Sequence, residues 1–283
     1  MNPILDLLVP ALLVLLMFVV GLGLTGADFV RIRERKGAVV LATVAQATLL
    51  PVLAAGLVWV FHPEPPIAAG LVFLAACPGG ALSNYYCHLA RADVAFSVVL
   101  TAVASLASLV TLPFAAQLGF LLQGGAESRV SVPVVRILLQ LTLFVLLPIL
   151  IGISTRARRS TTTLRWLPTL NRLCLVALVL VLLAVFVDQL GAVSNGVVSI
   201  VVLAVLFTFL GFAMGAALGW ILKIGIAATS SLALEFSVRN LGVMALVAVT
   251  VLGRLDYLLF GAVFLVVQFP IALLATRLIR RVV

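Results

Sequence analysis

A carboxylate and a guanidinium lie inside a long apolar segment of this sequence. Glu235 and Arg239 are four residues apart, among aliphatic and hydroxyl-bearing neighbours. On a helix this spacing allows the two charges to pair. A charged side chain at the centre of a membrane helix costs about 2.5–3.5 kcal/mol on insertion scales, and such residues commonly mark functional sites. Two interpretations stay open: a self-neutralising pair that fixes packing, or a carboxylate that holds a cation.

A second polar cluster lies far upstream in the chain. Ser83 and Asn84 follow a Cys-Pro-Gly-Gly run at 77–80, and Ser97 and Thr101 are spaced to share one helix face. Hydroxyl and amide oxygens combined with one carboxylate suit a hard cation such as sodium. Hydrogen bonding between helices is the alternative role for these small polar residues.

The elements that must position these residues are membrane helices. Of 283 residues, 64% are hydrophobic and only 10% charged, whereas soluble domains carry about 25% charged residues. A helix needs about 20 apolar residues to span a bilayer. Nine segments qualify: 4–25, 38–61, 67–89, 94–122, 132–153, 167–187, 197–222, 226–252 and 255–278. We therefore predict an all-α polytopic membrane protein with nine transmembrane helices, which excludes soluble enzymes.

The charge balance is strongly basic, with 18 Lys and Arg against 9 Asp and Glu and a net charge of +9. Taken alone, this would suggest nucleic acid as a partner. Most of the basic residues instead flank alternate spans on one side: Arg31, Arg33, Arg35, Lys36, Arg91, Arg156, Arg158, Arg159, Arg165, Arg172, Lys223, Arg277, Arg280 and Arg281. The positive-inside rule makes that side cytoplasmic and the N-terminus external.

These charges therefore report topology, and no nucleic-acid partner is expected. We expect an integral protein of a bacterial inner (plasma) membrane, surrounded by the lipid bilayer. The sequence indicates no obligate protein partner. Its three cysteines show neither a disulfide framework nor zinc-ligand spacing.

Two of the predicted spans contain helix breakers. The third span contains the 77–80 run, and the eighth contains Arg239-Asn240 and Gly242 after a Thr-Ser-Ser run. Broken backbone at membrane depth is tolerated only inside protein or beside a cavity. The odd separation of the two spans places them in opposite orientations, as in an inverted five-helix repeat that lacks its first helix. Two such discontinuous helices indicate a transporter site near the midplane.

Several motifs resemble those of the bile acid:sodium symporter family. They are ACPGGALSN at 76–84, LARAD at 89–93, Ser97-x-x-x-Thr101, the early motifs at 17–18, 23–25 and 28–29, Gln46 before Pro51, Leu234-Glu235 and Asn240. The resemblance implies two discontinuous helices that cross in a core domain at 37–122 and 194–283 (spans 2–4 and 7–9). It also implies a mobile panel domain at 1–30 and 130–190 (spans 1, 5 and 6).

The resemblance further implies ion sites and a substrate region. The first sodium site would comprise Ser83, Asn84, Ser97, Thr101 and Glu235. The second would comprise Gln46, Glu235, the backbone of Phe236 and Val238, and Arg239. The crossing region near the substrate would comprise Pro78, Gly79, Gly80, Asn84, Arg239 and Asn240. Sodium is the expected coupling ion, and no cofactor or other metal is expected.

Position 239 departs from the family, which usually has glutamine there. A guanidinium is always charged and would repel sodium. One hypothesis is that Arg239 occupies the second sodium position as a built-in cation, so that a single sodium ion is needed. The alternative hypothesis is that Arg239 neutralises Glu235 and that coupling to sodium is lost.

We predict a secondary active transporter, not an enzyme, that moves an organic anion by alternating access with sodium coupling. Bile-acid-like anions, keto acids and other carboxylates remain open as substrates. The alternatives are a sodium-independent anion carrier and a related exporter of a small oxyanion such as arsenite, with Cys77 near the substrate. The two broken helices disfavour a channel. No catalytic motif surrounds Glu235, which disfavours an intramembrane enzyme.

Overall fold

The computed structural model describes residues 3–25, 35–122, 142–193 and 197–283, together with positions 30, 135 and 139. The regular elements of this described part are helices, as predicted. The α-helices are α1 (Pro3–Gly23), α3 (Lys36–Phe61), α4 (Pro65–Ala76), α5 (Ala81–Ala90), α6 (Val94–Leu122), α8 (Leu147–Arg158), α9 (Ser160–Val193), α10 (Val197–Ile221), α11 (Ile226–Ser237), α12 (Leu241–Leu246) and α13 (Leu258–Ile279). Two π-helical turns, Thr142–Leu146 and Val247–Val251, and a 3-10 turn, Leu255–Tyr257, complete them.

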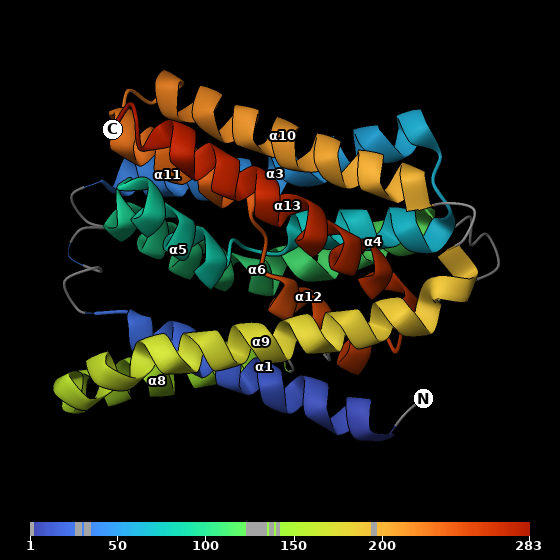
Figure 1. Ribbon diagram of the computed structural model, residues 1–283, viewed down its shortest axis with the longest axis horizontal. Helices are drawn as coiled ribbons and strands as arrows, with labels where there is room; N and C mark the ends of the chain where they lie inside the picture. Colours follow the sequence, from blue (N-terminus) through green and yellow to red (C-terminus); the bar gives the residue numbers. More distant parts are fainter. Residues whose placement is uncertain are drawn as a thin grey trace.

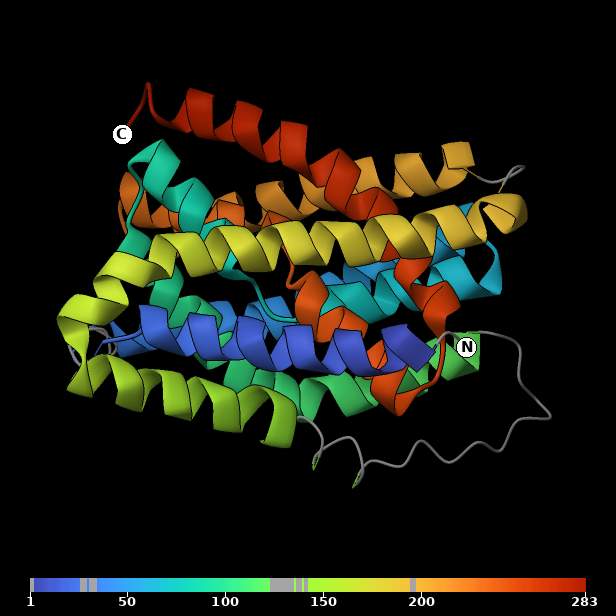
Figure 2. The same ribbon diagram turned by 60° about the horizontal axis from the view of Figure 1, so that its bottom comes forward.

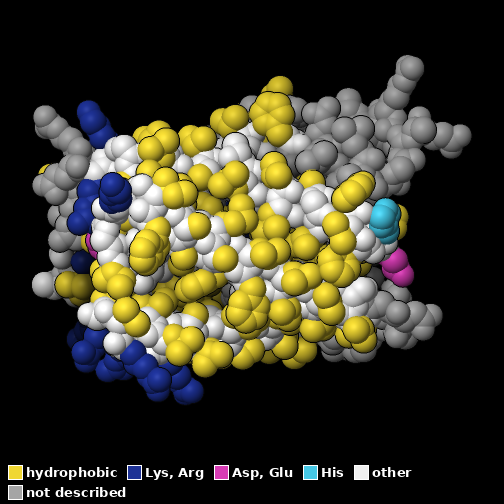
Figure 3. All heavy atoms as spheres, turned by 90° about the horizontal axis from the view of Figure 1, so that it is seen from above, with side chains coloured by type: hydrophobic (Ala, Val, Ile, Leu, Met, Phe, Trp, Pro, Cys, Tyr) yellow, Lys and Arg dark blue, Asp and Glu magenta, His cyan; other side chains and the backbone are white. Residues whose placement is uncertain are grey.

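The helices have the apolar character of membrane spans. Within the described residues, three segments are long and apolar enough to cross a bilayer: Lys36–Phe61, Val197–Ile221 and Leu255–Ile279. Shorter apolar helices lie at Val14–Gly23, Pro65–Ala76 and Val94–Ser108. Apolar side chains cover the middle of the molecule, and basic side chains gather toward one end (Figure 3). The chain is an integral membrane protein.

Part of the predicted topology lies beyond the described residues. The predicted fifth span includes residues 132–134, 136–138 and 140–141, which the structure does not describe. Arg31 and Arg33 also lie outside the described part. The number of nine spans therefore stays a prediction.

The junction between α8 and α9 is tighter than the sequence suggested. The fifth span was expected to end at 153 and the sixth to begin at 167, but only Arg159 separates the two helices. Arginine is a good helix former, and cations are favourable in the last turn of a helix. With 34 residues, α9 is about 51 Å long and exceeds the ~30 Å hydrocarbon core.

Helices α1, α8 and α9 form a group along one side of the molecule, beside the remaining helices (Figures 1 and 2). Small residues allow close contact in this group. A Cβ atom added to Gly21 of α1 would lie 2.2 Å from the carbonyl oxygen of Ile149 in α8. The backbones of the two helices therefore touch directly.

Helices α4 and α11 form the interior around the broken segments, and α10 lies outside them. Every residue of α4 from Ile67 to Ala76 is buried, as expected for a helix that is apolar on all sides. Helix α11 packs closely on α10 across the stripe of Gly211, Gly215 and Gly219. A Cβ atom on Gly215 would lie 2.6 Å from the carbonyl oxygen of Leu232, so this stripe serves helix packing.

Candidate functional site

The two helix breaks meet at the middle of the molecule (Figure 1). The connection between α4 and α5 and the connection between α11 and α12 are extended. They pair through an antiparallel bridge between Gly79 and Arg239. The backbone N–H of Asn240 donates to the carbonyl oxygen of Pro78 at 2.9 Å. The residues predicted for the crossing region therefore lie together.

Glycine at position 79 is required by a close approach of Glu235. A Cβ atom at Gly79 would lie 1.9 Å from Oε1 of Glu235, which no side chain can tolerate. A Cβ atom at Gly80 would lie 3.3 Å from the Cα atom of Asn240. Because they lack side chains, Gly79 leaves room for the carboxylate of Glu235 and Gly80 leaves room for the backbone of Asn240.

The carboxylate of Glu235 is fully buried and faces hydroxyl groups of α5 and α6. Ser83 donates to Oε2 in a short hydrogen bond. Ser97 donates to Oε2 at 3.3 Å, and Thr101 donates to Oε1 at 2.8 Å. Both hydroxyls also lie near Oδ1 of Asn84, at 2.7 Å and 3.4 Å. The structure thus brings together all five residues predicted for the first sodium site, which we call the Glu235 cage.

The hydroxyl protons of Ser97 and Thr101 in the Glu235 cage have alternative acceptors. Each hydroxyl of Ser97 and Thr101 lies within hydrogen-bonding distance of both Glu235 and Asn84, yet it carries only one proton. An ionised carboxylate and an amide oxygen donate none. A cluster of hydroxyl and amide oxygens around a buried carboxylate is chemically suited to a hard cation.

Arg239 points away from this carboxylate and contacts the ends of two helices. Its Nη2 donates to the carbonyl oxygen of Ala75 at 3.0 Å, and its Nη1 donates to the carbonyl oxygen of Glu235 at 3.5 Å. These carbonyls belong to the last turns of α4 and α11, where the helix dipoles place partial negative charge. Arg239 therefore acts as a cationic cap for both helices.

The pairing of Glu235 with Arg239 on one helix does not occur. Helix α11 ends at Ser237, so Arg239 lies in the extended break and not one turn further along. In the described part of the chain, the two side chains form no ion pair. The interruption of the helix directs the carboxylate toward α6 and the guanidinium toward α4.

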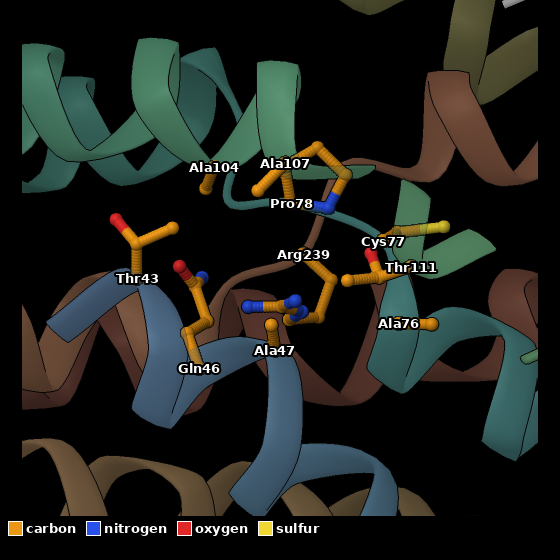
Figure 4. A pocket seen from close by; sticks show the side chains of 10 residues that line it. All are labelled: Thr43, Gln46, Ala47, Ala76, Cys77, Pro78, Ala104, Ala107, Thr111 and Arg239. Atoms are coloured by element: carbon orange, nitrogen blue, oxygen red, sulfur yellow. The ribbon is translucent and has the colours of Figure 1, made fainter. Parts of the chain in front are cut away.

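A small pocket lies beside Arg239, between α3 and α6 (Figure 4). It is lined by Thr43, Gln46, Ala47, Ala76, Cys77, Pro78, Ala104, Ala107, Thr111 and Arg239. The Nε atom of Arg239 and the Oγ1 atom of Thr43 are buried and have no hydrogen-bond partner among the described residues. Gln46 Nε2 donates to the carbonyl oxygen of Glu235 at 3.5 Å, the same oxygen that Arg239 contacts.

The residues predicted for the second sodium site are only partly together. Gln46, Arg239 and the backbone of Glu235 meet beside this pocket. Phe236 and Val238 follow Glu235 closely in the sequence, and both residues are buried. A Cβ atom on Gly211 would lie 2.9 Å from the carbonyl oxygen of Phe236, which places that carbonyl against α10.

Thr43 and the carbonyl oxygen of Ala75 are among the contributors to the site that were not predicted. Thr43 lies three residues before Gln46 on the same face of α3, and this spacing could have identified it. The carbonyl oxygen of Ala75 accepts from Arg239, and the side chain of an alanine gives no signal for such a role.

An all-helical membrane fold with two broken helices that meet beside a buried oxygen-rich cage defines a membrane transporter. Sequence comparison identifies which family of transporters it is. A profile of the Sodium Bile acid symporter family matches residues 10–196. The chain belongs to this family and is a transporter-family protein, not an enzyme, as the sequence predicted.

The chain is also similar to individual transporters. It is 25% identical over 234 residues to the uncharacterized sodium-dependent transporter YocS of Bacillus subtilis (strain 168), covering 83% of this chain and 71% of that protein. It is 26% identical over 241 residues to the hepatic sodium/bile acid cotransporter of Rattus norvegicus, covering 81% and 64%. It is 31% identical over 103 residues to the probable chloroplastic sodium/metabolite cotransporter BASS2 of Oryza sativa subsp. japonica, covering 36% and 25%.

Proposed function

We propose that this protein is a secondary active transporter that couples sodium to the movement of a small organic anion. The observation that carries the proposal is the Glu235 cage, in which hydroxyl and amide oxygens surround a fully buried carboxylate. Sodium in this cage would be held by Ser83, Asn84, Ser97, Thr101 and Glu235. The relatives described as sodium-dependent transporters support the same assignment.

Sodium would add a direct link between three helices that already pack on one another. The cage takes side chains from α5, α6 and α11, so a bound ion would stabilise one arrangement of all three. That arrangement also fixes Gly79, Gly80 and Asn240 at the crossing. An organic anion would bind beside this crossing, where Arg239 adds positive charge. Coupling follows if the anion binds better to the sodium-stabilised arrangement.

The same proposal divides the molecule into two moving parts. The panel would comprise α1, α8 and α9, which pack together on one side (Figure 2). The core would comprise the remaining helices, with the two discontinuous helices crossing inside it. Nine spans would form an inverted five-helix repeat that lacks its first helix. The basic end of the molecule would face the cytoplasm of a bacterial cell, with the N-terminus outside.

Arg239 would replace a second sodium ion. It lies beside Gln46 and the carbonyl oxygen of Glu235, where a second cation would be held, and it already neutralises the C-terminal ends of α4 and α11. A permanent cation there would leave one sodium ion to bind. The protein would then transport with one sodium per cycle.

Sodium-driven uptake by purified protein in liposomes tests this function. Candidate bile-acid-like anions, keto acids and other carboxylates are first screened by thermal shift with and without sodium. An anion that stabilises the protein only with sodium is then used for uptake driven by an inward sodium gradient. Uptake with one sodium per anion supports the proposal. Anion uptake that is indifferent to sodium would assign the protein to the uncoupled carriers.

A further inference from the structure

The pocket beside Arg239 is lined by two buried donor groups that no described residue satisfies. Arg239 is 2% exposed and Thr43 is 7% exposed, and both side chains line the pocket. The Nη1 and Nη2 atoms of Arg239 contact backbone carbonyls, whereas Nε has no partner in the described part of the chain. Figure 4 shows the guanidinium extending toward α3, the helix that carries Thr43 and Gln46. One N–H group of this guanidinium is therefore left to donate to a bound group.

Thr43 differs from Thr48, which lies further along the same helix. The hydroxyl of Thr48 donates to the carbonyl oxygen of Val44 at 2.8 Å, a common bond to the preceding helical turn. Thr48 is exposed, whereas Thr43 is buried and its hydroxyl has no partner among the described residues. Because a buried polar group without a partner is costly, Thr43 indicates that a bound group supplies one.

The chemistry and size of the pocket select a small anion. The N–H group of Arg239 can donate but cannot accept, and the hydroxyl of Thr43 has a proton to donate. The guanidinium is always charged and repels cations. The cavity volume is about 10 Å³, room for about one water-sized group, whereas pockets for organic ligands have about 300–1,000 Å³. A monatomic anion therefore suits this pocket, and a whole organic anion does not.

The formal charges at the crossing connect this pocket to the Glu235 cage. Glu235 and Arg239 are both buried, and together they carry no net charge. A sodium ion in the cage would raise the total to +1, and a monovalent anion in the pocket would return it to zero. An uncompensated charge inside a protein is costly, so each ion should strengthen the binding of the other.

We propose that the pocket beside Arg239 binds one small inorganic anion, such as chloride, together with the sodium ion of the Glu235 cage. Nε of Arg239 and the hydroxyl of Thr43 donate to this anion. The inference rests on the proposed sodium-coupled function. The small anion is a partner of the bound sodium ion and is separate from the organic anion that is transported.

The affinity for sodium in different salts tests the linkage. Binding of radioactive sodium to the purified protein is measured at constant ionic strength in chloride or in methanesulfonate, whose anion is too large for the pocket. Chloride should raise the sodium affinity by about fivefold or more, the lower end of typical coupling between two sites. Equal affinities in the two salts would mean that the pocket holds water only, which would overturn the proposal.

Substitutions at three positions locate the effect. Thr43→Val removes the hydroxyl and keeps the shape of the side chain, so half of the chloride effect should require roughly tenfold more chloride. Thr48→Val removes an exposed hydroxyl from the same helix and should keep the chloride response of the wild type. Arg239→Gln removes the charge and should abolish the response. An undiminished response in both Thr43→Val and Arg239→Gln would place the anion elsewhere and overturn the site.

Acetate distinguishes an inorganic anion from the carboxylate end of a transported substrate. Sodium affinity is measured with acetate in place of chloride, under the same conditions. A smaller effect of acetate than of chloride supports a separate inorganic anion. A larger effect of acetate would assign the pocket to a carboxylate of the substrate and overturn the proposal.

These outcomes are distinguishable from a failure of the proposed function. Absence of sodium binding in every salt would reject the sodium site in the Glu235 cage, and the linkage with it. Sodium binding that is indifferent to chloride would leave the proposed function standing and reject the anion site alone.

Discussion

Arg239 donates a hydrogen bond from Nη2 to the carbonyl oxygen of Ala75 at 3.0 Å, which fixes its guanidinium at the C-terminal end of α4. The same guanidinium reaches the carbonyl oxygen of Glu235 in the last turn of α11. One side chain therefore connects the ends of the two broken helices. A positively charged side chain therefore lies at the crossing, where we propose that it replaces a second sodium ion.

The first prediction concerns the number of sodium ions. Arg239→Gln removes the fixed charge and adds an amide oxygen beside Gln46, so a second sodium ion should bind. The Hill coefficient for sodium-dependent stabilisation should rise from about one to about two, since it is bounded by the number of sites. Arg239→Lys keeps the charge and should stay near one. If the wild type, Arg239→Gln and Arg239→Lys all had the same Hill coefficient for sodium, Arg239 would not replace an ion.

The second prediction concerns the hydroxyl ligands of the cage. Thr101→Val removes an oxygen that contacts Oε1 of Glu235 and should weaken sodium binding roughly tenfold or more, given about 1.5–3 kcal/mol for hydrogen bonds to charged groups. Ser105 is buried one turn further along α6 and donates to the backbone of Thr101. Ser105→Ala should therefore leave sodium affinity nearly unchanged. Isothermal titration with sodium compares the two variants.

The third prediction concerns the close approach at the first helix break. Gly79→Ala would force its Cβ atom onto the carboxylate of Glu235, so the cage must open or the crossing must shift. Sodium binding should be lost, and thermal stability should fall by the equivalent of about 1–3 kcal/mol, as for overpacked cores. Gly56 in α3 is exposed and has open space around it, so Gly56→Ala should be neutral or stabilising. Sodium binding by Gly79→Ala at wild-type affinity would contradict this geometry.

The fourth prediction concerns the packing of α11 on α10. Gly215→Ala places a methyl group 2.6 Å from the carbonyl oxygen of Leu232, and the two helices must separate. The thermal midpoint should fall, measured by thermal unfolding in detergent. A Cβ atom added to Gly23, at the end of α1, would meet no atom of the described residues within 4 Å, and Gly23→Ala serves as the matched control. An unchanged midpoint in Gly215→Ala would show that the helices can adjust at little cost.

The sequence predicted the helical membrane class and the two broken spans because hydropathy and helix breakers are local signals. The spacing of Ser97 and Thr101 also identified one face of α6, and the structure places both beside Glu235. The hydrogen bond from Arg239 to Ala75 depends on a backbone oxygen brought near by tertiary packing. Of the two interpretations of Glu235 and Arg239, the ion pair does not form, because α11 ends between the two residues.

The length of the α8–α9 junction was not predicted for a related reason. Hydropathy detects the apolar part of a helix inside the bilayer, but it does not detect polar helical turns that extend beyond the bilayer. The arginines between 156 and 172 were assigned to a loop, whereas the structure places most of them in helices. Helix propensity, which is favourable for arginine, was the competing signal.

The central claim is that the Glu235 cage binds one sodium ion, and equilibrium binding of radioactive sodium to the purified protein tests it most directly. Wild-type protein should bind one ion per chain, and Glu235→Gln should bind none. Glu64→Gln, which alters an exposed acidic residue before α4, should bind as the wild type does. Two ions per wild-type chain, or undiminished binding by Glu235→Gln, would contradict the account.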